Sequence, residues 1–84
     1  MQIIDARIAK ATGEYVDFGN LVREKLGMQC QYASRYLDGT IEGYPCLGEG
    51  LRIAGSLDMY HTLLIHKDDA DEFIRRMTEY RESR

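Results

Sequence analysis

Several residue types are scarce in this 84-residue chain, which has no tryptophan, one proline and two cysteines. Cys30 and Cys46 lie sixteen positions apart and form no Cys-x-x-Cys pair, so a thioredoxin-like redox motif is excluded. In a cytosolic chain, two such thiols are expected to be reduced and buried rather than joined in a disulfide. No apolar run approaches the roughly 20 residues that a membrane helix requires.

Targeting motifs are also missing from the sequence. Residues 1–5 have neither a basic region nor a long apolar run, which is not typical of a signal peptide. The last four residues carry no lipidation motif. We therefore expect a soluble, cytoplasmic protein.

The motifs of common cofactor and catalytic sites are missing as well. The pattern C-x15-C-x14-H-x4-H has no tight cysteine knuckle for zinc, and His61 and His66 would point to opposite faces of a strand. The segment 48–50 reads Gly-Glu-Gly, but Ile53 stands where a dinucleotide fingerprint needs glycine. No serine lies in a Gly-x-Ser-x-Gly context. We expect no catalytic residue, no metal and no cofactor, and a protein that is not an enzyme.

Charge is mild in total but uneven along the chain. The net charge is −3, and residues 38–72 alone carry −6 because eight acidic residues there face two basic ones. The last twelve residues carry +2. An acidic middle segment favours a basic partner and disfavours nucleic acid, whose binding depends on phosphate contacts.

The first third of the chain predicts a strand and a helix. Residues 2–10 alternate Ile4, Ala6 and Ile8 with polar residues, which is the period of a half-buried strand. Residues 14–18 fit either a second strand or the approach to a helix. The helix that follows is capped by Asp17 or Asn20 and ends at Gly27, with Phe18, Leu21, Val22 and Leu26 on one face.

The middle of the chain is predicted to be mostly strand. Alternation over residues 28–37, followed by Asp38-Gly39, predicts a hairpin with strands at 28–37 and 40–44. The glycine-rich stretch 43–50 is interpreted as a loop or as a strand edge with a bulge. Further strands are expected at 51–54 and 60–66, separated by a turn at 55–58.

The last helix has the clearest local signal. Asp68 or Asp69 can cap it, and one stripe contains Ala70, Phe73, Ile74, Met77 and either Tyr80 or Arg81. Two acid-before-base pairs four positions apart, Asp71–Arg75 and Glu72–Arg76, support it. Residues 1–84 therefore predict a single two-layer α+β domain: a mostly antiparallel sheet of four to six strands with two helices packed on one face, the second of them C-terminal.

Tyrosine and acidic residues together indicate a surface for a protein partner. Six tyrosines occur, and tyrosine is enriched where proteins meet because it is rigid and amphipathic. We predict a non-enzymatic interaction module that binds a basic surface of a protein partner; a small acidic inhibitor of the phage type, such as an anti-restriction or anti-CRISPR protein, is a concrete form of it. The predicted partner-binding residues are Tyr32, Tyr36, Asp38, Glu42, Tyr44, Glu49, Asp58 and Tyr60.

Three alternatives remain open at this stage. The glycine-rich segment 43–55, beside Cys46 and His61, could form a small-molecule or catalytic site. Aromatic and basic side chains interleave at Tyr32, Arg35 and Tyr36, as in single-stranded RNA binders. An exposed strand edge at 28–36 could pair with a second copy in a homodimer.

Overall fold

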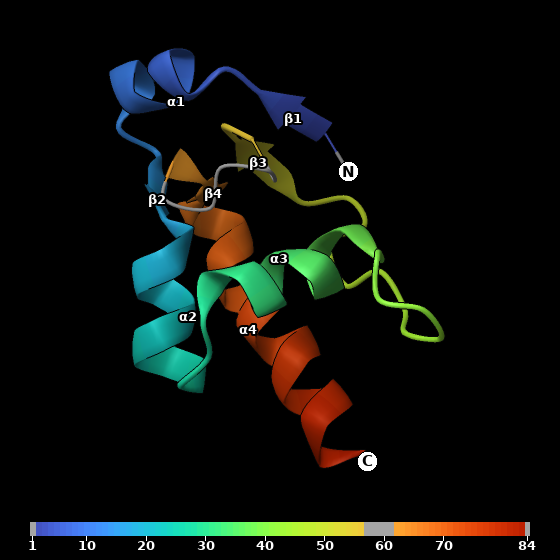
Figure 1. The fold of residues 1–84 in the computed structure, drawn as a ribbon. Helices are drawn as coiled ribbons and strands as arrows, with labels where there is room; N and C mark the ends of the chain where they lie inside the picture. The colour runs from blue at the N-terminus through green and yellow to red at the C-terminus, as the bar shows by residue number, and fades with distance from the viewer. Residues whose placement is uncertain (1, 57–61, 84) are drawn as a thin grey trace.

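The computed structural model describes residues 2–56 and 62–83, and it shows an α+β fold (Figure 1). The predicted class is therefore confirmed, although the described residues contain four helices rather than two. The elements follow one another as β1 (Gln2–Ile4), α1 (Ala6–Thr12), β2 (Tyr15–Asp17), α2 (Phe18–Leu26), α3 (Cys30–Asp38), β3 (Arg52–Ala54), β4 (Leu64–His66) and α4 (Lys67–Glu82).

The four strands form one mixed sheet in the order β1-β3-β4-β2. The β3–β4 and β2–β4 pairs are antiparallel, as predicted, whereas β1 runs parallel to β3. Parallel neighbours require a crossover connection, and α1, α2 and α3 all lie between β1 and β3 in the chain. Ile53 faces Ile65 across the centre of the sheet, and both side chains are fully buried.

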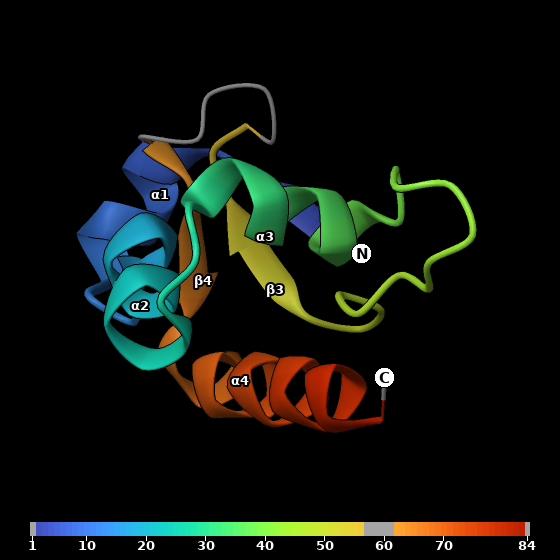
Figure 2. The ribbon, with the colours of Figure 1, turned by 60° about the horizontal axis from the view of Figure 1, so that its bottom comes forward.

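Three helices cover the sheet face that carries Ile53 and Ile65. Side chains of α2, α3 and α4 form one core cluster with these isoleucines, and the rings of Phe18 and Phe73 lie 5.2 Å apart inside it. In Figure 2, α2 lies at the left, and α3 and α4 both run from its side of the molecule toward the right. Figure 1 shows α1 on the other side of the strands, where Ala9 and Ala54 are buried outside this cluster. The two predicted helices, α2 and α4, therefore do share one face of the sheet, whereas α1 is an additional helix on the other side.

The predicted strand at 2–10 holds only to Ile4, because α1 begins at Ala6. Asp5 caps α1 by accepting a hydrogen bond from the backbone N–H of Arg7 at 2.7 Å. Ile8, which completed the alternating pattern, is 60% exposed, so burial does not enforce the strand period here. The open choice at 14–18 is decided in favour of a strand, β2.

The predicted hairpin at 28–44 is wrong, because residues 30–38 form α3. Gly39 has a φ of 73°, and its N–H caps the helix on the carbonyl oxygen of Arg35. A helix end and a tight hairpin turn both require positive φ, so Asp-Gly suits either structure. Burial fits only the helix: Ser34 and Leu37, three positions apart, are both buried, whereas a strand would point them to opposite faces of the sheet.

The helix predicted after Asp17 is confirmed as α2. The Asp17 carboxylate accepts a hydrogen bond from the N–H of Asn20 at 2.9 Å, and Gly27 ends the helix with a φ of 65°. The strand predicted at 51–54 is present as β3. The strand predicted at 60–66 is present over Leu64–His66, while its residues 60 and 61 lie outside the described part of the chain.

The C-terminal helix is confirmed, but its cap differs from the prediction. His66 is the N-cap residue, and neither Asp68 nor Asp69 takes this role. The predicted pair of Glu72 with Arg76 is present at 2.9 Å. Arg75 does not pair with Asp71; it binds Glu72 and, at 2.7 Å, Glu79. Glu72 precedes both of its arginines, as the sequence indicates, whereas Glu79 follows Arg75.

Candidate interaction surface

The segment between α3 and β3, residues 39–51, contains two tight turns. We call it the 39–51 loop; it is the yellow-green segment that extends beyond the end of α3 in Figure 1. Hydrogen bonds between first and fourth residues close turns at 41–44 and 48–51, at 3.1 and 3.0 Å. Gly43 and Gly50 occupy the third position of each turn with a φ of 80°, as a type II turn requires. Gly43 and Gly50, two glycines of the segment considered above as a ligand site, therefore serve the turns of this loop.

The loop is tied back to the last turn of α3. The N–H groups of Leu47 and Gly48 donate to the carbonyl oxygens of Tyr36 and Leu37, at 2.9 and 3.1 Å. The thiol of Cys46 donates to the Leu37 oxygen as well, at 2.8 Å. Gly48 lies so close to Leu37 that a Cβ atom there would collide with this carbonyl oxygen. Only glycine therefore fits this position without movement of the loop or the helix.

A second attachment comes from α4. The guanidinium of Arg76 donates through Nη1 to the carbonyl oxygens of Leu47 and Glu49, at 3.0 and 2.8 Å. Its Nε donates to the carboxylate of Glu72 at 2.9 Å, which holds the guanidinium in place. One planar side chain thus links the loop to the last helix, a role that suits arginine because its donors have fixed directions.

Three tyrosines form the third attachment. The rings of Tyr36 on α3, Tyr44 in the loop and Tyr80 on α4 contact one another pairwise, with centroids 5.4 to 5.8 Å apart. All three side chains are half-buried. We call this group the tyrosine cluster. Sequence reasoning placed Tyr36 and Tyr44 on the candidate surface but missed the contact of Tyr80, whose only signal was its place on the apolar stripe of α4.

The predicted acidic residues divide into two groups. Glu42 and Glu49 have exposed side chains in the 39–51 loop, whereas Asp38 is half-buried at the end of α3 and accepts a hydrogen bond from the N–H of Thr40 at 3.0 Å. No lysine or arginine occurs in residues 36–51. Tyr32 lies one turn before Tyr36 and is 49% exposed. The structure therefore brings six of the eight predicted residues to α3 and its loop; Asp58 and Tyr60 lie outside the described residues.

Two of the alternatives, the RNA-binding residues and the strand edge at 28–36, concern the segment that forms α3. Tyr32, Arg35 and Tyr36 do share one side of α3 by their spacing, but the ring of Tyr36 packs against Tyr44 and Tyr80. The predicted strand edge at 28–36 does not exist, because this segment enters α3. Pairing with a second copy through that edge is therefore ruled out.

The burial predicted for the two cysteines is only partly correct. Both are reduced thiols, as expected, but Cys30 is half-buried and Cys46 is exposed. Burial, reinforced by the nearby charge of Asp17, raises the pKa of the Cys30 thiol to about 11. The thiol is therefore protonated at neutral pH, and a protonated thiol is a poor nucleophile.

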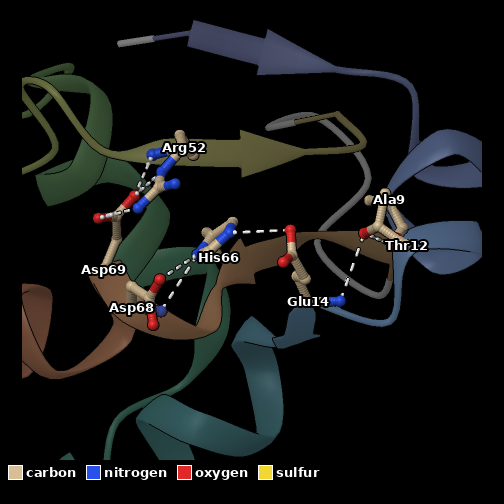
Figure 3. Close-up of polar contacts among 7 residues, drawn as sticks. All are labelled: Ala9, Thr12, Glu14, Arg52, His66, Asp68 and Asp69. Atoms are coloured by element: carbon tan, nitrogen blue, oxygen red, sulfur yellow. Dashed lines mark hydrogen bonds and ion pairs between the residues drawn. The ribbon is translucent and has the colours of Figure 1, made fainter.

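A buried histidine marks the junction of β4 and α4 (Figure 3). The Nδ1 atom of His66 accepts a hydrogen bond from the N–H of Asp68 at 3.1 Å, and Nε2 lies 3.4 Å from a carboxylate oxygen of Glu14. The ring also contacts Tyr15 edge-on, with centroids 5.0 Å apart. Both ring nitrogens therefore face polar groups of the protein itself. His66 joins α4 to the start of β2.

Next to it, an ion pair joins β3 to α4 (Figure 3). The Asp69 carboxylate accepts two hydrogen bonds from the guanidinium of Arg52, at 2.8 and 3.1 Å, and a third from the Arg52 backbone N–H at 2.8 Å. These hydrogen bonds hold the pKa of Asp69 below its usual range. Asp69 therefore orients the first turn of α4 on the sheet.

Two classes of site find no support in residues 2–56 and 62–83. No three side chains of histidine, cysteine, aspartate or glutamate gather there in a group that could hold a metal ion. Of the helices described, none is long and apolar enough to cross a membrane.

Comparison of the chain with family models, with curated proteins and with solved structures finds no match.

Proposed function

We propose that this protein is a non-enzymatic interaction module that docks the exposed face of α3 and the 39–51 loop onto a basic surface of a protein partner. The observation that carries the proposal is that an acidic, irregular loop is held in one conformation by three separate attachments. Those attachments are the α3 carbonyls, the Arg76 side chain and the tyrosine cluster.

The order of the loop matters because binding costs conformational entropy. A segment that is already fixed loses little freedom when it meets a partner, so more of the contact energy appears as affinity. Loops of this length without regular structure are uncommon in compact domains unless they have a function. The 39–51 loop contributes Leu51 to the buried core, while its tip residue Glu42 stands in solvent.

Charge indicates the kind of partner. Glu42 and Glu49 are exposed in a stretch of sixteen residues, 36–51, that contains no basic side chain. Such a field attracts a basic surface over about 8 Å at physiological salt and raises the rate of association. Tyr32, near the start of α3, offers an exposed aromatic ring, and tyrosine is one of the side chains enriched as anchors in protein interfaces. A small acidic inhibitor that covers a basic groove of its target fits this description.

The test compares two variants with the same change in charge. Glu42→Lys/Glu49→Lys reverses two exposed carboxylates of the loop, and Glu24→Lys/Asp71→Lys reverses two exposed carboxylates on α2 and α4. Each variant changes the net charge from −3 to +1. The tagged wild type is used to capture its partner from the native host, and the purified partner is then titrated against all three proteins.

We expect the loop variant to bind at least about tenfold more weakly, mainly through slower association, while the other variant keeps its affinity. Tyr32→Ala, which removes no core contact, should weaken binding by about 1–2 kcal/mol through faster dissociation. Wild-type affinity in the loop variant would refute the proposal, as would the absence of any captured protein.

A further inference from the structure

A second surface, at the opposite end of α4, is a groove with an apolar lining and charged side chains around it. It lies between β2, one side of α2 and the start of α4, with a volume of about 470 Å³. Its apolar lining is formed by Val16, which is 38% exposed on the outer strand of the sheet, together with the half-buried Leu21 and the buried Ala70. These side chains reach the groove from three different elements. The core therefore continues to the surface here.

Charged side chains surround this apolar lining. Asp17, Glu24 and Asp71 contribute three carboxylates, and Lys67 contributes one amine. All four side chains are exposed. Glu24 lies near the end of α2 and Asp71 near the start of α4, so the acidic groups stand on separate elements with apolar atoms between them. The lining thus combines an apolar centre with a predominantly acidic rim.

The groove carboxylates differ from others on the molecule. Asp5, Asp69 and Glu72 each bind an arginine through hydrogen bonds. By contrast, no side-chain hydrogen bond or ion pair within residues 2–56 and 62–83 involves Glu24 or Asp71. Asp17 uses one oxygen to cap α2 and keeps the other available. The rim can therefore accept cationic partners without breaking an existing contact.

We infer that this groove binds a basic peptide segment of a protein partner, in which an apolar side chain enters the groove and flanking lysines or arginines pair with Glu24 and Asp71. A single metal ion would not satisfy the site, because these carboxylates belong to no group of three ligands close enough for one. A chain segment can present an apolar group and two separated cations at once. Electrostatic complementarity of this kind supplies specificity as well as faster association.

The inference goes beyond the proposed function, because the groove and the 39–51 loop are different sites. Asp71 lies near the start of α4 and Tyr80 near its end, nine residues apart, which corresponds to about 14 Å along the helix. The protein can therefore hold a basic peptide in the groove while the loop contacts a folded surface. Either site can fail in experiment without affecting the other.

The probe for the test is a displayed library of random twelve-residue peptides, selected on the full-length protein. We expect enriched peptides with lysines or arginines on both sides of an apolar residue. Their affinity should fall at least tenfold in Glu24→Lys/Asp71→Lys and remain at the wild-type level in Glu42→Lys/Glu49→Lys. The near-isosteric variant Glu24→Gln/Asp71→Asn removes the charges with little risk to the fold and should weaken binding at least threefold.

Amide chemical shifts of the protein, recorded with an enriched peptide, locate the contact directly. Shifts confined to residues around Val16, Leu21 and Asp71, reduced by added salt, would support the inference. Three results would overturn it: no enrichment of basic peptides, equal affinity for the groove variants and the wild type, or shifts that map to the 39–51 loop.

Discussion

Arg76 should contribute far more to stability than its neighbour Arg75, although both are arginines on the same helix. Arg76 donates hydrogen bonds to two loop carbonyls as well as to Glu72, whereas Arg75 only pairs with Glu72 and Glu79 at the surface. The substitutions Arg76→Lys and Arg75→Lys preserve charge in both cases. The two variants therefore separate the effect of the guanidinium hydrogen bonds on stability from the effect of the positive charge.

The expected magnitudes follow from these contacts. A lysine at 76 can reach one acceptor but not two carbonyls and a carboxylate together. A hydrogen bond to a charged group contributes about 1.5–3 kcal/mol when buried and less when exposed. Since the Arg76 side chain is 30% exposed, we expect Arg76→Lys to lower the free energy of unfolding by about 1–2 kcal/mol. Arg75→Lys keeps two exposed ion pairs and should cost about 0.5 kcal/mol or less.

Urea denaturation followed by circular dichroism measures both effects. In a domain of this size, a loss of 1 kcal/mol corresponds to a decrease of about 4–8 °C in Tm. Hydrogen exchange locates the change: the amides of Leu47 and Gly48, which bond to α3, should exchange faster in Arg76→Lys only. If the two variants unfold at the same urea concentration and protect these amides equally, Arg76 does not hold the loop.

Three further predictions concern other sites. Hydrogen bonds from Arg75 and Arg76 lower the pKa of Glu72 to about 2. The stability that its carboxylate contributes should therefore be present above about pH 4.5 and decrease as the pH falls toward 2. Glu72→Gln should flatten this pH dependence of the free energy of unfolding in urea titrations, and an unchanged profile would contradict the prediction. A thiol reagent at pH 8 should modify exposed Cys46 at least tenfold faster than Cys30, whose pKa is raised to about 11, and equal rates by mass spectrometry would contradict the burial of Cys30. Gly48→Ala should destabilise the protein by about 2–3 kcal/mol because the added methyl group meets the Leu37 carbonyl oxygen. Gly43→Ala has open space around it and should cost only the roughly 1 kcal/mol of a positive φ. Equal losses of stability in thermal unfolding would refute this steric reason.

The structure confirms the sequence predictions mainly where local signals and burial agree. The cap at Asp17, the stripe of Phe18 and Val22, and Gly27 at the end of α2 all indicate one helix, and the helix is present. The apolar stripe of α4 is confirmed for the same reason. In these segments the hydrophobic period and the capping residues leave a single structure that satisfies both.

The candidate surface was predicted in composition but not in shape. The acidic residues and tyrosines of α3 and its loop were identified from the sequence, but as two strands of a hairpin. The attachment by Arg76 could not be predicted, because it joins residues 27 and 29 positions apart through backbone carbonyls that carry no sequence signal. The contact of Tyr80 with Tyr36 and Tyr44 likewise depends on where α4 ends relative to α3.

The sequence by itself determined the α+β class, the two amphipathic helices α2 and α4, and the acidic character of residues 36–51, because composition, period and caps act over a few residues. The tertiary structure decided whether Asp38-Gly39 closes a hairpin or ends a helix. It also decided that β1 pairs in parallel with β3, and that the loop is held by α4. These outcomes depend on which apolar side chains can be buried together, and that choice is made by the whole core rather than by any single segment.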